Sequence, residues 1–146
     1  MIAVVLDTNV AVAGLLWTGP ALCLLRHAQT GHCRILASQP MVDELAAVLQ
    51  RSKFLERLRA LRVTPEIPLT FYRNLVWFCA VAPLAGERCC DTSDQMFVDL
   101  AVAEAAHLLV SGDTHVLRMR RVGGIPVVRV TEALAVLAQL VAPPRG

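Results

Sequence analysis

The stretch IAVVLDTN, residues 2–9, places five consecutive apolar residues directly before an aspartate. A short apolar run that is rich in β-branched residues is typical of a strand buried on both faces of a parallel sheet. We therefore expect a strand over residues 2–6 that ends at Asp7. In open α/β sheets, ligands bind outside the carboxyl ends of the strands, and a carboxylate is costly to bury there alone. Asp7 therefore needs a positively charged partner.

Length and composition indicate one domain with a sizeable core. The chain has 146 residues, of which 55% are hydrophobic and 18% are charged, and its formal net charge is +2. This length fits a single domain, expected over residues 1–142 and followed by a tail at 143–146. So apolar a composition predicts that a partner or a second copy covers part of the surface, and we expect a homodimer.

The sequence also predicts a cytoplasmic protein. No apolar run of membrane-spanning length occurs, and the N-terminus lacks the basic region of a signal peptide. The number of cysteines is odd, and none forms a C-x-x-C pair, which argues against zinc. Adjacent Cys89 and Cys90 could be redox-active, but reduced thiols are expected in the cytoplasm.

Strand and helix signals alternate along the chain, which predicts an α/β domain with a mainly parallel sheet. Right-handed crossovers then bring the ends of the strands to one edge of the sheet. Strands are expected over residues 2–6, 33–37, 79–82, 108–111 and 126–130. Helices are expected over residues 21–28 (with 18 as an alternative start), 38–49, 51–62, 69–78, 92–106, 116–120 and 131–141.

Acidic residues recur at the predicted carboxyl edge. Asp7 and Asp113 each follow a predicted strand, and two helices that begin near this edge carry Glu44 and Asp94. The apolar stripe of the helix over residues 38–49 places Glu44 beside the buried face, whereas its neighbour Asp43 points away. Around the start of the helix over residues 92–106, Asp91 could contribute as well as Asp94. The alternative is that each is a separate surface acid.

Four converging acids without matching bases predict a metal site. Like charges at close range would force some of the carboxyl groups to protonate. A hard divalent cation such as Mg²⁺ or Mn²⁺ prefers carboxylate oxygens and removes this conflict. Such an ion can activate water and stabilise a leaving oxyanion in phosphodiester hydrolysis.

Four segments in this order resemble PIN-domain ribonucleases, specifically the small prokaryotic toxins of toxin–antitoxin pairs. The segments are residues 4–9 (VVLDTN), 38–45 (SQPMVDEL), 91–94 (DTSD) and 109–113 (LVSGD). The resemblance spans residue 2 to about residue 130. It implies a three-layer α/β/α sandwich around a five-stranded parallel sheet. It also implies cleavage of RNA with Mg²⁺ or Mn²⁺, and an antitoxin as a partner of a type II pair.

The resemblance also implies roles for individual residues. The catalytic, metal-binding acids would be Asp7, Glu44, Asp94 and Asp113. Asn9 and Ser111 occupy the polar supporting positions of such sites, and Thr8 would help less directly. Thr92 and Ser93 stand where relatives often carry proline and another acid, so Asp91 remains an alternative ligand. His115 stands where a second acid is common, which favours one firmly held metal over two.

Basic and apolar surfaces suggest partners. Three arginines follow Asp113 closely and would hold RNA phosphates, namely Arg118, Arg120 and Arg121. The basic helix over residues 51–62 could do the same or could be a solvated face. The apolar helices over residues 21–28 and 134–141 are candidates for a homodimer interface or an antitoxin groove, with core burial as the alternative.

Two other functions remain open from the sequence. A haloacid-dehalogenase-type phosphohydrolase also uses an aspartate at the end of its first strand, as a nucleophile. Those enzymes carry D-x-D at this point, whereas this chain has Asn9 in place of the second acid. A non-catalytic nucleic-acid-binding PIN-like domain is the other alternative. A dinucleotide-binding role is disfavoured because no G-x-G-x-x-G follows the first strand.

Overall fold

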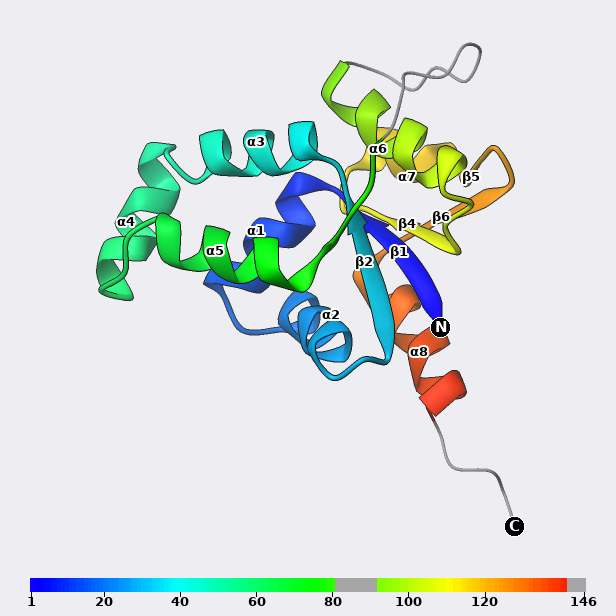
Figure 1. Ribbon diagram of the computed structural model, residues 1–146, viewed down its shortest axis with the longest axis horizontal. Helices are drawn as coiled ribbons and strands as arrows, with labels where there is room; N and C mark the ends of the chain where they lie inside the picture. The colour runs from blue at the N-terminus through cyan, green and yellow to red at the C-terminus, as the bar shows by residue number, and fades with distance from the viewer. Residues whose placement is uncertain (81–91, 142–146) are drawn as a thin grey trace.

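The computed structural model describes residues 1–80 and 92–141, with the side chains of residues 92–94 and 141 outside the description. It is an α/β fold around a six-stranded sheet with the strand order β3-β2-β1-β4-β6-β5 (Figure 1). Neighbouring strands are parallel except for the antiparallel pair β5 and β6. The strands are β1 (Ile2–Leu6), β2 (Cys33–Ala37), β3 (Trp77–Phe78), β4 (Leu108–Val110), β5 (Arg121–Val122) and β6 (Ile125–Val128).

Helices flank this sheet on both faces. They are α1 (Thr8–Leu16), α2 (Pro20–Gln29), α3 (Gln39–Val48), α4 (Ser52–Ala60), α5 (Glu66–Leu75), α6 (Thr92–Ala103), α7 (Thr114–Arg118) and α8 (Val130–Val141). Helices α2 and α8 pack against each other below the strands in Figure 1, and α6 packs against β1 and β4 from above. Helix α3 contacts α1, α5 and α6, and α4 lies at the far end of this group. The predicted α/β class is therefore confirmed.

Helix α1 is an element that the sequence analysis missed. Asp7 is its N-cap, so the helix begins directly after β1, well before the helix expected over residues 21–28. After Thr8 and Asn9 all of its residues are apolar or glycine, so it lacks the amphipathic period by which a surface helix is recognised. A Cβ at Gly14 would lie 2.7 Å from the Cδ1 atom of Leu25. This glycine therefore permits the close approach of α1 and α2.

The sheet differs from the predicted one in its two outermost strands, β3 and β5. The expected number of five strands is wrong, because β5 adds a sixth strand through a hairpin with β6. Gly123 and Gly124 form the turn with φ values of 53° and 81°, which glycine adopts most easily. The third strand of the described residues is the short β3, which ends before residue 79, and residues 81–82 of the strand expected over 79–82 lie outside the described residues. Helix α5 ends at Leu75 rather than at residue 78, and this leaves Trp77 and Phe78 to pair with β2.

The helices of the described residues are short relative to the length that a bilayer requires. None of them alone is both long and apolar enough to cross a membrane. Helices α1 and α2 reach that length and composition only together, and the chain bends by 89° between them. Their apolar residues form part of the hydrophobic core.

Cysteine chemistry adds no crosslink to the described part of the chain. Cys23, Cys33 and Cys79 are free thiols. Burial raises the pKa of the Cys33 thiol to about 11, so this group stays protonated and unreactive at neutral pH. Cys89 and Cys90, predicted to be reduced, lie outside the described residues, as does the expected boundary at residues 142–143.

Candidate active site

Adjacent parallel strands bring two of the predicted acids to one edge of the sheet. In the register of β1 and β4, Leu6 lies opposite Val110. The backbone N–H of Asp7 then donates to the carbonyl of Val110 at 3.0 Å. The chain continues from β4 through Ser111 and Gly112 to Asp113. Both aspartates therefore leave the sheet at its carboxyl edge, as the strand pattern predicts.

The Asp7 carboxylate is held at both of its oxygens. Oδ1 accepts a hydrogen bond from the Val10 backbone N–H at 2.8 Å, and Oδ2 accepts one from the Ser111 hydroxyl. The side chain is buried, with only 6% of its surface exposed. Burial raises the pKa of Asp7, the hydrogen bonds from Ser111 and Val10 lower it, and the nearby charge of Asp113 raises it again. The net shift is upward, because the site around Asp7 offers hydrogen bonds but little compensating positive charge.

Ser111 connects the two strand-end aspartates. Its side chain is fully buried, and its hydroxyl donates to Asp7 while accepting from the Asp113 backbone N–H at 3.0 Å. Asp113 is the N-cap of α7, where its Oδ1 accepts from the His115 backbone N–H at 2.7 Å. His115 itself is exposed. One buried hydroxyl thus fixes both the orientation of Asp7 and the path of the chain that carries Asp113.

Glu44 reaches the same region from α3. It is half-buried, and its Oε2 accepts a hydrogen bond from the Thr8 hydroxyl at 2.6 Å. The neighbouring Asp43 is exposed and accepts from the side chain of Gln39 on its own helix. Thr8, the first residue of α1, therefore ties the start of that helix to the acid on α3.

A cleft of about 190 Å³ collects these groups at the carboxyl edge. It is lined by Asp7, Thr8, Asn9, Glu44, Val48, Arg51, Phe97 and Asp113. Asp94 belongs to the first turn of α6, but its side chain is outside the description, and Asp91 lies outside the described residues altogether. Among the side chains that the structure describes, no three of the His, Cys, Asp and Glu type form a metal-binding group. The carboxylate oxygens in the cleft are nevertheless the donor type that Mg²⁺ and Mn²⁺ prefer.

Several residues of this region carry no signal in the sequence. Phe97 and Val48 line the cleft only because α6 and α3 meet beside β1. Tyr72 on α5 is buried, and its pKa is raised by burial and by the charge of Asp7. Arg51 stood among the basic residues of a predicted helix, with no indication that it would reach the acids.

The arginines that follow Asp113 do not line the cleft. Arg118 lies in the last turn of α7 and is exposed. Arg120 is exposed with a φ of 57°, and the Arg121 guanidinium donates to the Gly124 carbonyl at 3.1 Å. Their proximity to Asp113 in the sequence therefore does not place them among the cleft residues of the described chain.

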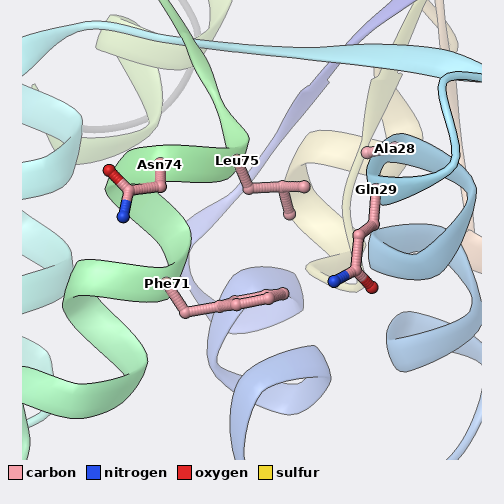
Figure 2. A pocket seen from close by; sticks show the side chains of 5 residues that line it. All are labelled: Ala28, Gln29, Phe71, Asn74 and Leu75. Atoms are coloured by element: carbon pink, nitrogen blue, oxygen red, sulfur yellow. The ribbon is translucent and has the colours of Figure 1, made fainter.

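Two hollows beside α5 lie away from the acids. One, of about 370 Å³, separates α2 from α5, and Figure 2 shows Phe71 and Leu75 extending from α5 toward Gln29 on α2. The other, of about 390 Å³, is an apolar groove to which Leu61, Ile67 and Phe71 contribute exposed side chains. Neither is lined by a carboxylate, so the chemistry proposed for the acids belongs to the cleft at the carboxyl edge.

Known proteins include one with a similar fold and a family whose model matches this chain. The chain is similar in fold to the crystal structure of VapBC2 from Rickettsia felis bound to a DNA fragment from their promoter, with a TM-score of 0.60 and 15% sequence identity. The match covers 88% of this chain and 98% of that chain. No curated protein matches the sequence. A family model described as PIN domain matches residues 3–115, which include every residue lining the cleft. The chain therefore belongs to the PIN domain family.

Proposed function

We propose that this protein is a metal-dependent endoribonuclease that hydrolyses phosphodiester bonds of RNA. PIN domains are generally nucleases that use divalent metal ions. The observation that carries the proposal is the convergence of Asp7, Glu44 and Asp113 on one cleft from three different elements. Acids that only stabilised helix ends would have no reason to share a cleft.

In this proposal Asp7, Glu44, Asp94 and Asp113 hold Mg²⁺ or Mn²⁺, with Asp91 as an alternative ligand. A bound ion would supply Lewis-acid activation of the attacking water and stabilisation of the charge that develops on the phosphate. The hydroxyl of Thr8 keeps Glu44 oriented, and the hydroxyl of Ser111 does the same for Asp7. Asn9 is exposed at the cleft and offers an amide oxygen or N–H to a ligand or to the RNA.

The pKa of Asp7 supports a cation at this position. Burial raises the pKa, so the ionised form of this carboxyl is disfavoured in the protein alone. A cation at the cleft favours the ionised form, because an opposite charge at close range stabilises a buried carboxylate. A bound metal ion would therefore favour the ionised form of Asp7, and the ionised Asp7 would in turn bind the metal ion more tightly.

For the biological role we propose the toxin of a type II toxin–antitoxin pair, acting in the cytoplasm. The fold is similar to the structure of VapBC2 from Rickettsia felis bound to a fragment of promoter DNA. An antitoxin protein would be the partner of this chain, and a second copy would form a homodimer. The exposed Ile67 and Phe71 give the apolar groove between α1 and α5 a surface that such partners could cover. Copurification of the chain with the product of an adjacent reading frame tests the antitoxin directly.

The function is tested by RNA cleavage. Wild-type protein and Asp7→Asn are incubated with single-stranded RNA in Mg²⁺ or Mn²⁺ and, as a control, with a chelator. We expect the wild type to cleave only with metal, and Asp7→Asn to lose at least about 100-fold of this activity, more than a supporting residue would cost. Equal cleavage by the two proteins would contradict the assignment. Binding of RNA without cleavage would favour the non-catalytic domain, and a phospho-aspartate at Asp7 would favour the phosphohydrolase.

A further inference from the structure

The turn between α3 and α4 places Arg51, an exposed residue, in the lining of the acidic cleft. Its backbone N–H donates to the Val48 carbonyl at 3.0 Å, which closes the turn directly after α3. Its own carbonyl accepts from the backbone N–H groups of Phe54 and Leu55, each at 3.0 Å, so Arg51 is also the N-cap of α4. Val48 lies one turn beyond Glu44 and lines the cleft too. Arg51 therefore extends the row of cleft residues on α3.

Two cations on α4, Lys53 and Arg57, are held by neighbouring side chains, and a third, Arg59, is exposed and does not line the cleft. The Lys53 ammonium lies 4.8 Å from the ring centre of Phe54. The Arg57 guanidinium lies 5.4 Å from the ring centre of Trp17, and its Nε donates to the Leu16 carbonyl at 2.8 Å. These contacts fix both charges on the structure of α1 and α4, away from the acids.

The Arg51 guanidinium differs from both of them. Within the part of the chain that the structure describes, it makes no hydrogen bond, ion pair or ring contact. It remains unpaired although Glu44 and Asp113 line the same cleft. It is also the only cation among the described residues that line this cleft. Its donors are therefore available to a ligand.

We propose that Arg51 binds a backbone phosphate of the RNA that enters the cleft, an inference that rests on the proposed ribonuclease function. Three carboxylates would repel a polyanion, and a cation at the entrance reduces this repulsion. The planar guanidinium can donate two parallel hydrogen bonds to two oxygens of one phosphate. Such a contact positions the strand without reading the base. Arg51, rather than the arginines that follow Asp113, supplies the phosphate contact at the cleft.

The test is the binding of single-stranded RNA by Arg51→Gln, Arg51→Lys and the control Arg59→Gln. Arg59 is an exposed arginine near the other end of α4, outside the cleft. Affinity is measured by fluorescence anisotropy in a chelator, where no cleavage is expected, over a series of salt concentrations. We expect Arg51→Gln to bind about tenfold more weakly, as for the loss of a charge-assisted hydrogen bond pair. The slope of log affinity against log salt should fall in magnitude by about 0.7, the value for one single-strand phosphate contact.

The two other variants separate a phosphate contact from a structural role. Arg51→Lys keeps the charge and should keep the salt slope while losing part of the affinity. Arg59→Gln should bind within about twofold of the wild type. If Arg51→Gln matches Arg59→Gln in affinity and slope, the inference is overturned, even where the wild type cleaves RNA. A wild type that binds no RNA also overturns it. If the wild type binds RNA without cleaving it and Arg51→Gln still shows the loss, the nuclease proposal fails and the phosphate contact stands.

Discussion

The carboxyl edge and the amino edge of the sheet both carry polar groups, but these groups have different roles. At the carboxyl edge, Asp7 and Asp113 leave β1 and β4 and face a cleft. At the amino edge, where Figure 1 marks the N-terminus, the His107 Nδ1 accepts from the Ala3 backbone N–H at 3.0 Å. The His107 backbone N–H in turn donates to the Ala3 carbonyl at 2.8 Å. The imidazole thus completes the hydrogen bonding at the start of β1.

This contrast indicates that strand direction predicts the position of the candidate site better than the volume of a hollow does. The hollow at the amino edge, lined by His32 and His107 among others, has a volume of about 720 Å³ against about 190 Å³ for the acidic cleft. The polar groups of the cleft come from the ends of adjacent parallel strands and from helices that follow strands. This is the edge at which α/β proteins bind their ligands.

The largest difference in activity is expected between the matched variants Glu44→Gln and Asp43→Asn. We expect Glu44→Gln to lower kcat/KM for RNA cleavage by at least about 100-fold, because a metal ligand costs more than a supporting residue. Asp43→Asn, an exposed change on the adjacent residue, should stay within about twofold. Comparable losses in both variants would show that position in the cleft is irrelevant to activity.

A smaller loss is expected when the orientation of Glu44 is disturbed. Thr8→Val removes the hydroxyl that donates to Glu44 at 2.6 Å while keeping the shape of the side chain. Supporting residues of metal sites typically contribute 10- to 100-fold, so cleavage and Mn²⁺ affinity should fall by about that range. Thr8→Ser keeps the hydroxyl and should retain most of both. A fully active Thr8→Val would mean that Glu44 needs no orientation.

The pH dependence of stability probes the buried acid without metal. The pKa of Asp7 is raised by burial, with Ser111 and Val10 lowering it, so the folded protein binds this proton more tightly than the unfolded chain does. The free energy of unfolding then falls as the pH rises from about 3.9, the ordinary value, through the folded pKa, and it stays low above that. Urea denaturation in a chelator should show this fall in the wild type. Asp7→Asn, which does not titrate, should show less of it and be the more stable protein at neutral pH.

The smallest effect is expected at the amino edge. His107→Ala removes one acceptor for the Ala3 N–H, so the free energy of unfolding should fall by about 0.5–1.5 kcal/mol. Cleavage per folded molecule should be unchanged, because this edge lies at the opposite end of β1 from Asp7. Thermal denaturation and RNA cleavage measured on the same sample check both parts. If His107→Ala lost much of the activity at unchanged stability, the amino edge would also contribute to activity, which contradicts the proposed difference between the two edges.

The sequence predicts the α/β class and the edge at which the acids lie, because both depend on strand direction and local pattern. Asp7 and Asp113 follow apolar runs, and helix phase turns Glu44 toward the cleft. Helix α1 could not be predicted in this way, because its residues after Asn9 are all apolar or glycine and therefore show no amphipathic period. Strand β5 has only two residues and forms through its hairpin with β6.

The position of Arg51 at the cleft likewise could not be predicted from the sequence. Its place at the cleft depends on the turn between α3 and α4, where its backbone N–H bonds to the Val48 carbonyl. In the sequence it is one of several cations in a basic segment, and among the described cations of residues 51–62 only Arg51 lines the cleft. Conversely, the arginines after Asp113 are near that acid in sequence but do not line the cleft.

We propose that carboxylates from separate elements together hold a divalent cation, and the most direct test of this proposal is Mn²⁺ binding. Free Mn²⁺ is followed by electron paramagnetic resonance during titration with the wild type, Asp7→Asn and the exposed control Asp43→Asn. We expect the wild type and Asp43→Asn to bind Mn²⁺ saturably, and Mg²⁺ to displace the bound Mn²⁺. Asp7→Asn should bind Mn²⁺ at least about tenfold more weakly. Mn²⁺ binding that is absent from the wild type, or unchanged in Asp7→Asn, would contradict this proposal.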